Sequence, residues 1–271
     1  MNLRLGLTAG LIMVTVLTFG AVLGHDFLSW DDDVFVYRNP HLQPPTLASL
    51  KAYWTAPYAP LYVPLPYTVW WLIARAAGRT NAHGQWVVAP LPFHAASLLV
   101  HLLNVLLAFG LLRLLMRHDG AAFAGALLYA VHPIQVETVA WLSELKDLLS
   151  GTFSLTALWL FLGWRRGAER RTAWRGVLAT LAFGLALLCK PNVVALPLVA
   201  ALLATVVEGQ SYRRWGGVVL LWLALAGAYA LFTRHAQPIS PELALPLGQR
   251  LLIAGDTLAF YLSKLVWPVR L

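Results

Sequence analysis

The chain has 271 residues, of which 59% are hydrophobic and 12% are charged, about half the ~25% usual for soluble domains. A membrane span needs roughly 20 apolar residues, so this composition suffices for about eight spans; it excludes a soluble enzyme, a disordered chain and a nucleic-acid-binding domain. The net charge of +8 reflects basic residues in short loops between apolar runs, and the single cysteine, Cys189, excludes an intrachain disulfide.

The apolar runs predict an all-α, polytopic membrane protein with one membrane domain over 1–271. The first run, 6–23, is longer than the roughly 7–15 apolar residues of a signal peptide, so we favour a retained span over a cleaved signal. Further runs follow at 95–116, 121–131, 148–163, 174–189, 192–207, 215–232 and 251–267. About eight transmembrane helices are therefore expected.

A long, less hydrophobic segment, 24–92, separates the first two runs and is predicted to be the first extracytoplasmic loop. Within it, 47–54 and 67–77 mix aromatic with polar side chains and are too short to span. Short helices of this kind typically lie in the membrane interface. We therefore expect two interfacial helices in the loop.

Charged residues predict the orientation, because Lys and Arg are enriched in cytoplasmic loops. With a cytoplasmic N-terminus, that side holds Arg4, Arg113, Arg117, Arg165, Arg166, Arg170, Arg171, Arg175, Arg213 and Arg214. The outer side then holds the acids Asp26, Asp31, Asp32, Asp33, Glu137, Glu144, Asp147 and Glu242.

Three carboxylates stand together in Trp30-Asp31-Asp32-Asp33, just outside the first span. Crowded carboxylates favour proton uptake, which suits a general base. The alternative is a solvated acidic loop or an incidental cation site.

A second polar block covers 132–147. On a continuous helix Glu137, Trp141 and Glu144 would share one face, with Asp147 extending it. Carboxylates at the start of a span are costly unless they face a cavity or partners. The alternative is an acidic helix start that complements the helix dipole. His132 taken alone is more typical of an interfacial histidine with satisfied hydrogen bonds.

Polar residues also mark two other places. Lys190 lies in a tight connection, 189–192, on the outer side. Because lysine is unusual on that side, it needs an anionic partner, and Glu137, Glu144 or a lipid phosphate are the candidates. The alternative is that its side chain extends to the lipid headgroups. His101 and Asn104 are three residues apart within a span and are expected to face inward.

In combination these blocks resemble the bacterial relatives of the TMTC family of protein O-mannosyltransferases, which belong to the GT-C class of membrane glycosyltransferases. The resemblance is carried by Trp30-Asp31-Asp32-Asp33 with Arg38-Asn39-Pro40, by the 132–147 block and by Lys190-Pro191. It implies a GT-C-like fold and an inverting hexosyltransferase that moves mannose from a polyprenyl-phosphate donor to an acceptor hydroxyl, such as a Ser or Thr of an exported protein or a glycan.

The resemblance also assigns site residues. It nominates Asp31 and Asp32 as the catalytic pair, and it implies that Glu137, Lys146 and Lys190 face one outer cavity. The residues expected to bind the donor phosphate or the acceptor are Asp33, His132, Glu137, Glu144, Lys146 and Lys190. No metal site or cofactor is expected; a divalent cation is compatible with the acidic cluster but not required.

The chain departs from these relatives at several positions. Leu145 stands where many relatives have Arg, Cys189 stands where they often have Ser, and the chain stops after 267–271. The resemblance therefore implies a C-terminal truncation that removes further spans and tetratricopeptide repeats. The expected location is a bacterial plasma membrane. The alternative function is a non-catalytic scaffold or a protein that binds lipid-linked sugars.

Overall fold

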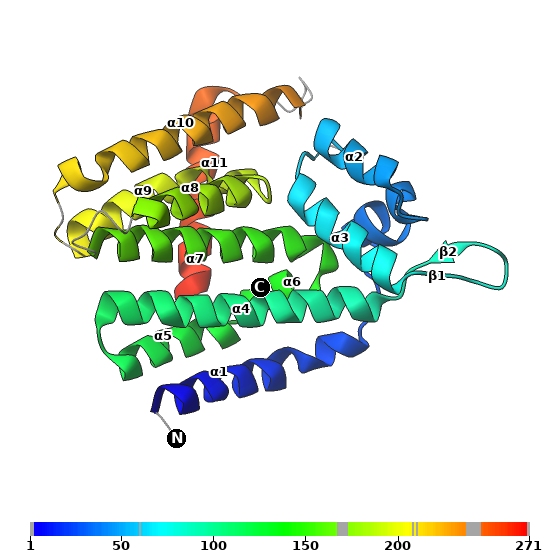
Figure 1. Ribbon diagram of the computed structural model, residues 1–271, viewed down its shortest axis with the longest axis horizontal. Coiled ribbons are helices and arrows are strands. Elements are labelled where there is room, and N and C mark those ends of the chain that lie inside the picture. The colour runs from blue at the N-terminus through cyan, green and yellow to red at the C-terminus, as the bar shows by residue number, and fades with distance from the viewer. Residues whose placement is uncertain are drawn as a thin grey trace.

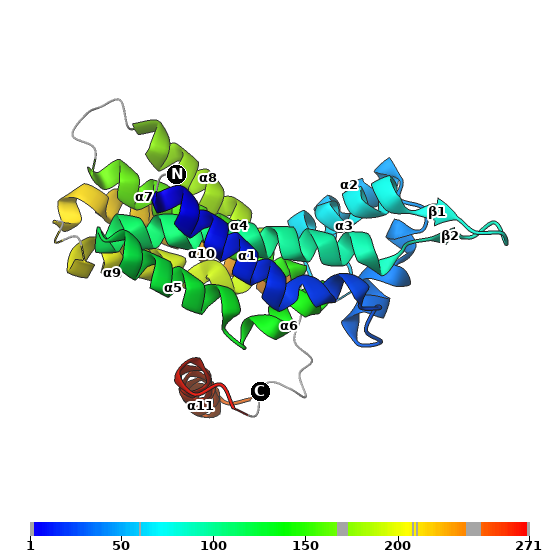
Figure 2. The ribbon, with the colours of Figure 1, turned by 90° about the horizontal axis from the view of Figure 1, so that it is seen from below.

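We analysed a computed structural model, which describes residues 3–59, 61–166, 173–207, 209, 211–236 and 245–269. Long helices run together along the longest axis of the molecule (Figure 1): α1 (Leu3–Phe19), α4 (Pro90–Met116), α5 (Asp119–Val131), α7 (Leu145–Arg166), α8 (Ala173–Leu187), α9 (Leu196–Leu202) and α10 (Tyr212–Ala236). Figure 2 shows α11 (Leu247–Val266) end-on, set apart from the bundle and crossing its direction.

Helices occupy all eight apolar runs, but they differ in length. Among the described residues, four segments are long and apolar enough to cross a membrane: Leu3–Gly24, Pro90–Met116, Leu142–Trp164 and Trp215–Ala236. Shorter apolar helices cover Asp119–Val131, Trp174–Leu187 and Pro191–Val207. The last run forms α11, which carries Arg250, Asp256 and Lys264. The membrane assignment is thus supported, and the number of eight spans stays a prediction.

Ion pairs join three helices at one end of the bundle. Where α4 passes into α5, the Nε atoms of Arg4 and Arg113 lie 3.0 and 2.7 Å from the carboxylate of Asp119. The opposite end carries the loop region between α1 and α4 (Figure 1). Arg170, Arg171 and Glu242 lie outside the described residues. Which end faces the cytoplasm stays a prediction.

The loop region folds onto one end of the bundle. Two helices lie where short ones were expected, α2 (Leu47–Thr55) and α3 (Pro64–Ala77); their place in the membrane interface stays a prediction. One detail of the all-α prediction is wrong: β1 (Arg79–Thr80) and β2 (Trp86–Val87) form an antiparallel hairpin. Its turn uses Gly84 at φ +74°, and Trp86 packs so closely on Gly78 that an added Cβ would lie 2.5 Å from the indole nitrogen. Glycines at these two positions permit the hairpin.

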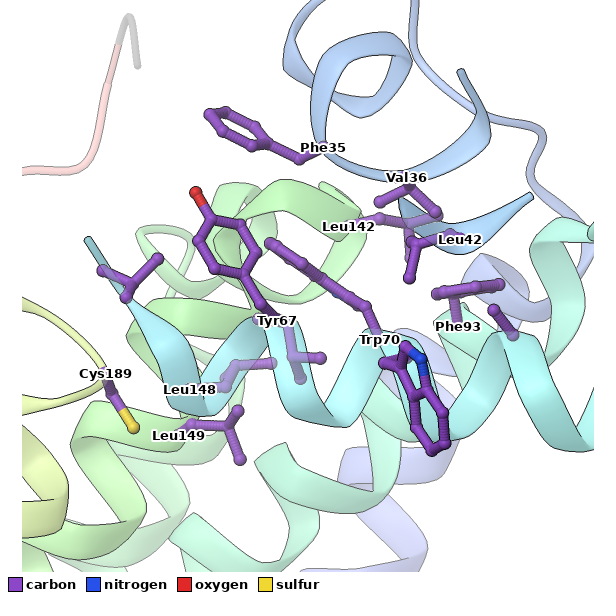
Figure 3. Close-up of a cluster of buried hydrophobic side chains, with 14 of the residues drawn as sticks. Phe35, Val36, Leu42, Tyr67, Trp70, Phe93, Leu142, Leu148, Leu149 and Cys189 are labelled. Atoms are coloured by element: carbon purple, nitrogen blue, oxygen red, sulfur yellow. The ribbon is translucent and has the colours of Figure 1, made fainter. Parts of the chain in front are cut away.

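An aromatic core fastens the loop region to the bundle. Phe35, from a π-helical turn η2 (Asp33–Tyr37), and Leu42, from η3 (Pro40–Leu42), pack with Tyr67 and Trp70 of α3 over α4 and α7 (Figure 3). Tyr67 also stacks on Tyr53 at 4.6 Å between ring centroids. Burial raises the pKa of both tyrosines well above their usual range. This packing holds the acidic segment 30–33 close to the start of α7.

Buried polar residues of α4 join that helix to its neighbours. The expectation that His101 and Asn104 face inward is confirmed, because both are buried. Asn104 Nδ2 donates to the Leu148 carbonyl at 2.8 Å, and Thr152 Oγ1 donates to Asn104 Oδ1 at 2.7 Å. Such bonds between helices contribute about 1 kcal/mol in membranes. They fix the position of α7, which carries several candidate site residues.

Candidate active site

The acidic segment meets the start of α7 through Asp32. Its Oδ1 accepts hydrogen bonds from the amide and the hydroxyl of Ser143, at 2.9 and 2.7 Å, and its Oδ2 accepts one from the Leu28 amide at 3.1 Å. The side chain is fully buried. A carboxylate beside the first amides of a helix also complements the helix dipole. Asp32 therefore connects the first loop to the bundle.

Its two neighbours are in a different environment. Asp31 and Asp33 are both half-buried. Asp33 Oδ1 accepts a hydrogen bond from the Val34 amide at 2.9 Å, next to it in the chain. Within the described ranges, no residue donates a hydrogen bond or forms an ion pair with the Asp31 carboxylate. Asp31 is thus the member of the cluster whose oxygens are available.

A break in the chain corrects the prediction of one continuous acidic face. α6 (Gln135–Ala140) ends before Trp141, whose backbone is extended at φ −90° and ψ 116°, and a new helical segment starts with η4 (Leu142–Glu144). The Ser143 amide donates to Asp32 and so is not available to continue α6. As a result Glu137 is exposed, whereas Glu144 is buried.

Two lysines and two carboxylates form a second group at the start of α7. Lys146 Nζ lies 2.8 Å from Glu144 Oε1, and Lys190 Nζ lies 3.4 Å from Glu144 Oε2. Lys190 also forms an ion pair with Asp147. Burial alone would lower the pKa of Lys190, but the hydrogen bond and charge of Asp147, together with Glu144, raise it. The expected anionic partner of Lys190 is therefore Glu144, joined by Asp147, and not Glu137.

Aromatic rings link this charged group to the acidic segment. Lys146 Nζ lies 5.8 Å from the centroid of the Phe35 ring and 5.9 Å from that of Trp141. Cations are attracted to the faces of aromatic rings at such distances. Because Phe35 belongs to the turn that follows Asp32, the lysines and the aspartates meet at one end of the bundle.

An open cavity of about 500 Å³ lies beside them, lined by Leu28, Ser29, Trp30, Glu137 and Trp141. Its volume is within the range of roughly 300–1,000 Å³ typical of ligand sites. Glu137 lines it, as the resemblance implied, but Lys146 and Lys190 do not. In the described part of the chain, no group of three or more His, Cys, Asp or Glu side chains could hold a metal ion.

His132 lies apart from the lysines. Its Nδ1 accepts a hydrogen bond from the Ile134 amide at 3.2 Å, and its Nε2 lies 3.1 Å from the carbonyl oxygen of Leu265 in α11. With Nδ1 accepting, Nε2 carries the proton and donates it. Both nitrogens are therefore engaged in holding the start of α6 and the end of α11, which agrees with an interfacial histidine whose hydrogen bonds are satisfied.

Sequence reasoning did not single out Ser143, and it gave Asp147 no role. Both lie in the 132–147 block, but Ser143 has its partner 111 residues away, and no local pattern marks such a pair. Asp147 could be identified because it extends the face of Glu137 and Glu144 on a continuous helix. Its partner Lys190, in the 189–192 turn, could not be identified in this way.

Comparison with known protein families shows to which class of protein the chain belongs. Residues 66–236, well over half of the chain, match the dolichyl-phosphate-mannose-protein mannosyltransferase family. The chain belongs to this family. It is accordingly a membrane glycosyltransferase of the GT-C class. No curated protein and no solved structure gave a significant match.

The match to the mannosyltransferase family covers one part of the site. It includes α3 to α10, and with them Glu137, Ser143, Glu144, Lys146 and Lys190. The Asp31–Asp33 cluster lies before the matched region. The contact between Asp32 and Ser143 ties this preceding segment to the family region.

Proposed function

We propose that this mannosyltransferase family member transfers a mannosyl group from a polyprenyl-phosphate donor to an acceptor hydroxyl, such as a Ser or Thr of an exported protein, at the outer face of a bacterial plasma membrane. The N-terminus lies in the cytoplasm. The observation that carries the proposal is the position of Asp31, a carboxylate with no hydrogen-bond or ion-pair partner among the described residues, at the same end of the bundle as two lysines.

In the proposed reaction the acceptor oxygen attacks the anomeric carbon on the face opposite the phosphate. The new C–O bond forms as the bond to the phosphate oxygen breaks, which inverts the configuration. The hydroxyl proton passes to Asp31 as general base, a role worth about 10²–10⁴ in rate. Asp32 is the positioning residue, because its oxygens already accept three hydrogen bonds.

The leaving group is a polyprenyl phosphate dianion, which needs cationic stabilisation. Lys190 is the more accessible of the two lysines, with 27% of its side chain exposed against 11% for Lys146. We assign the phosphate contact to Lys190. Glu144 holds both ammonium groups in place, and preorganised charges of this kind act strongly where water is scarce.

The test is transfer of radiolabelled mannose from a polyprenyl-phosphate donor to membrane and secreted proteins by the purified chain. We expect Asp31→Asn to lower kcat by about 100-fold or more, without a change in melting temperature. Asp26→Asn is the matched control, since Asp26 is an exposed carboxylate of the same loop with no assigned role, and it should transfer at the wild-type rate.

The other outcomes are distinct. If Asp31→Asn keeps full activity while a folded Asp32→Asn loses it, the base is Asp32 and the assigned roles are reversed. If both aspartate variants transfer like the wild type, the acidic cluster has no part in the chemistry. Binding of the donor without transfer by any form would favour the alternative, a protein that binds lipid-linked sugars.

A further inference from the structure

Aromatic side chains form part of the wall of the cavity beside Asp31. Trp30 lines it and is 75% exposed, so its ring is accessible to a ligand. Trp141, on the other side of the chain break, lines the same cavity, as does the exposed carboxylate of Glu137. Two indoles thus line one open space. Glu137, which lines it too, has no side-chain partner within the described ranges.

The geometry points to a subsite for a pyranose ring in this cavity, an inference that rests on the proposed function and gives it a substrate contact. A pyranose has one face of C–H bonds, which carries slight positive charge, and a rim of hydroxyl groups. The face of an indole carries negative charge and attracts such a surface. Ionised Glu137 accepts hydrogen bonds only, which suits hydroxyl donors and disfavours a phosphate.

The chain around the cavity supports this assignment. Asp32 binds the Leu28 amide in one wall and Ser143, two residues after Trp141, in the other. Both walls are therefore fixed to one buried carboxylate, and Asp31 directly follows Trp30. A ring stacked on Trp30 would lie next to the proposed base. Two sources fit the same chemistry: the sugar of the donor, or a sugar of a glycan acceptor.

The first experiment needs no catalysis. Saturation-transfer NMR with methyl α-D-mannopyranoside on the purified full chain should show transfer to the ring C–H protons. Trp30→Ala should weaken binding roughly tenfold, while Trp30→Phe should keep most of it. Trp174→Ala is the matched control, because Trp174 is 54% exposed, lies in the first turn of α8 and does not line the cavity; it should bind like the wild type.

The second experiment identifies the source. If the donor sugar occupies the cavity, Trp30→Ala and Glu137→Gln raise the KM for polyprenyl-phosphate mannose roughly tenfold and leave inhibition by bare polyprenyl phosphate unchanged. If an acceptor glycan occupies it, the KM for that glycan rises instead. Either result supports the subsite.

The inference is overturned if the wild type gives no saturation transfer, or if Trp30→Ala binds the mannoside as well as the wild type does. Its failure is distinguishable from failure of the proposed function. A wild type that binds mannoside through Trp30 but transfers no mannose supports the subsite and contradicts the proposed transferase activity. A wild type that transfers mannose without needing Trp30 supports the transferase activity and contradicts the subsite.

Discussion

At the residue scale, Ser143 determines which aspartate of the cluster is held by hydrogen bonds from another segment. Its amide and hydroxyl both donate to Asp32 Oδ1, whereas the neighbouring Asp31 has no donor among the described residues. A buried carboxylate that lost these donors would be costly, because desolvated charge needs partners. The selection of one carboxylate out of three therefore depends on a residue in another segment.

We expect Ser143→Ala to destabilise the protein by about 1–2 kcal/mol, since one hydrogen bond to a charged group is lost while the backbone bond remains. The transfer rate should fall less than in Asp31→Asn. Chemical denaturation in detergent gives the first quantity. Ser263→Ala, which removes only a local bond to the Phe260 carbonyl, is the control and should be close to neutral; equal losses in both variants would contradict the role of Ser143.

The candidate residues were identifiable from the sequence, but their partners were not. The charged motifs pointed to Asp31, Asp32 and Lys190 because polar groups at the end of an apolar run require a reason, and the family resemblance added Lys146. Whether Lys190 would bind Glu137 or Glu144 depended on the break at Trp141, which places the two glutamates in different environments. That break results from a contact across 111 residues.

At the element scale, the turn between α8 and η6 (Pro191–Ala195) is fixed to α7 through Lys190. The helices themselves follow from runs of apolar residues, so their positions were predictable. The hairpin β1–β2 was not, because it depends on the close approach of Trp86 to Gly78 and involves only two residues in each strand.

The ion pairs of Lys190 give an expected pH dependence. Its pKa is raised from 10.5, so its contribution to stability is complete below 10.5 and is lost as the pH rises through the higher folded-state value. The melting temperature of Lys190→Met should lie below that of the wild type by a constant amount from pH 8 to 9.5, and the gap should close only above pH 10.5. A gap that closes between pH 8 and 9.5 would contradict these pairings.

At the scale of the whole molecule, the candidate site and the arginine pairs of Asp119 lie at opposite ends of α4. Arg4 and Arg113 pair with Asp119 at one end, and the loop region with the candidate site lies at the other (Figure 1). Because basic residues of short loops favour the cytoplasmic side, the predicted orientation places the Asp119 end in the cytoplasm and the candidate site outside.

Cysteine labelling in intact cells tests the orientation. Cys189 is the only cysteine and is buried, so the background with a membrane-impermeant maleimide should be low. We expect His83→Cys, in the hairpin turn, to be labelled from outside. Met116→Cys, at the opposite end of α4, should react only after the membrane is permeabilised. The reverse pattern would place the site in the cytoplasm.

The bond between Asp32 and Ser143 also has a consequence for biosynthesis. The two residues are separated by 111 positions, and at about 5–20 residues per second the second emerges on the order of ten seconds after the first. Until then the Asp32 carboxylate stays hydrated, and the first loop lacks one wall of its cavity. The end that carries the candidate site is therefore completed late, after α4, α5 and α6 have been synthesised, so a nascent chain stalled before residue 143 lacks the contact that closes its first loop onto the bundle.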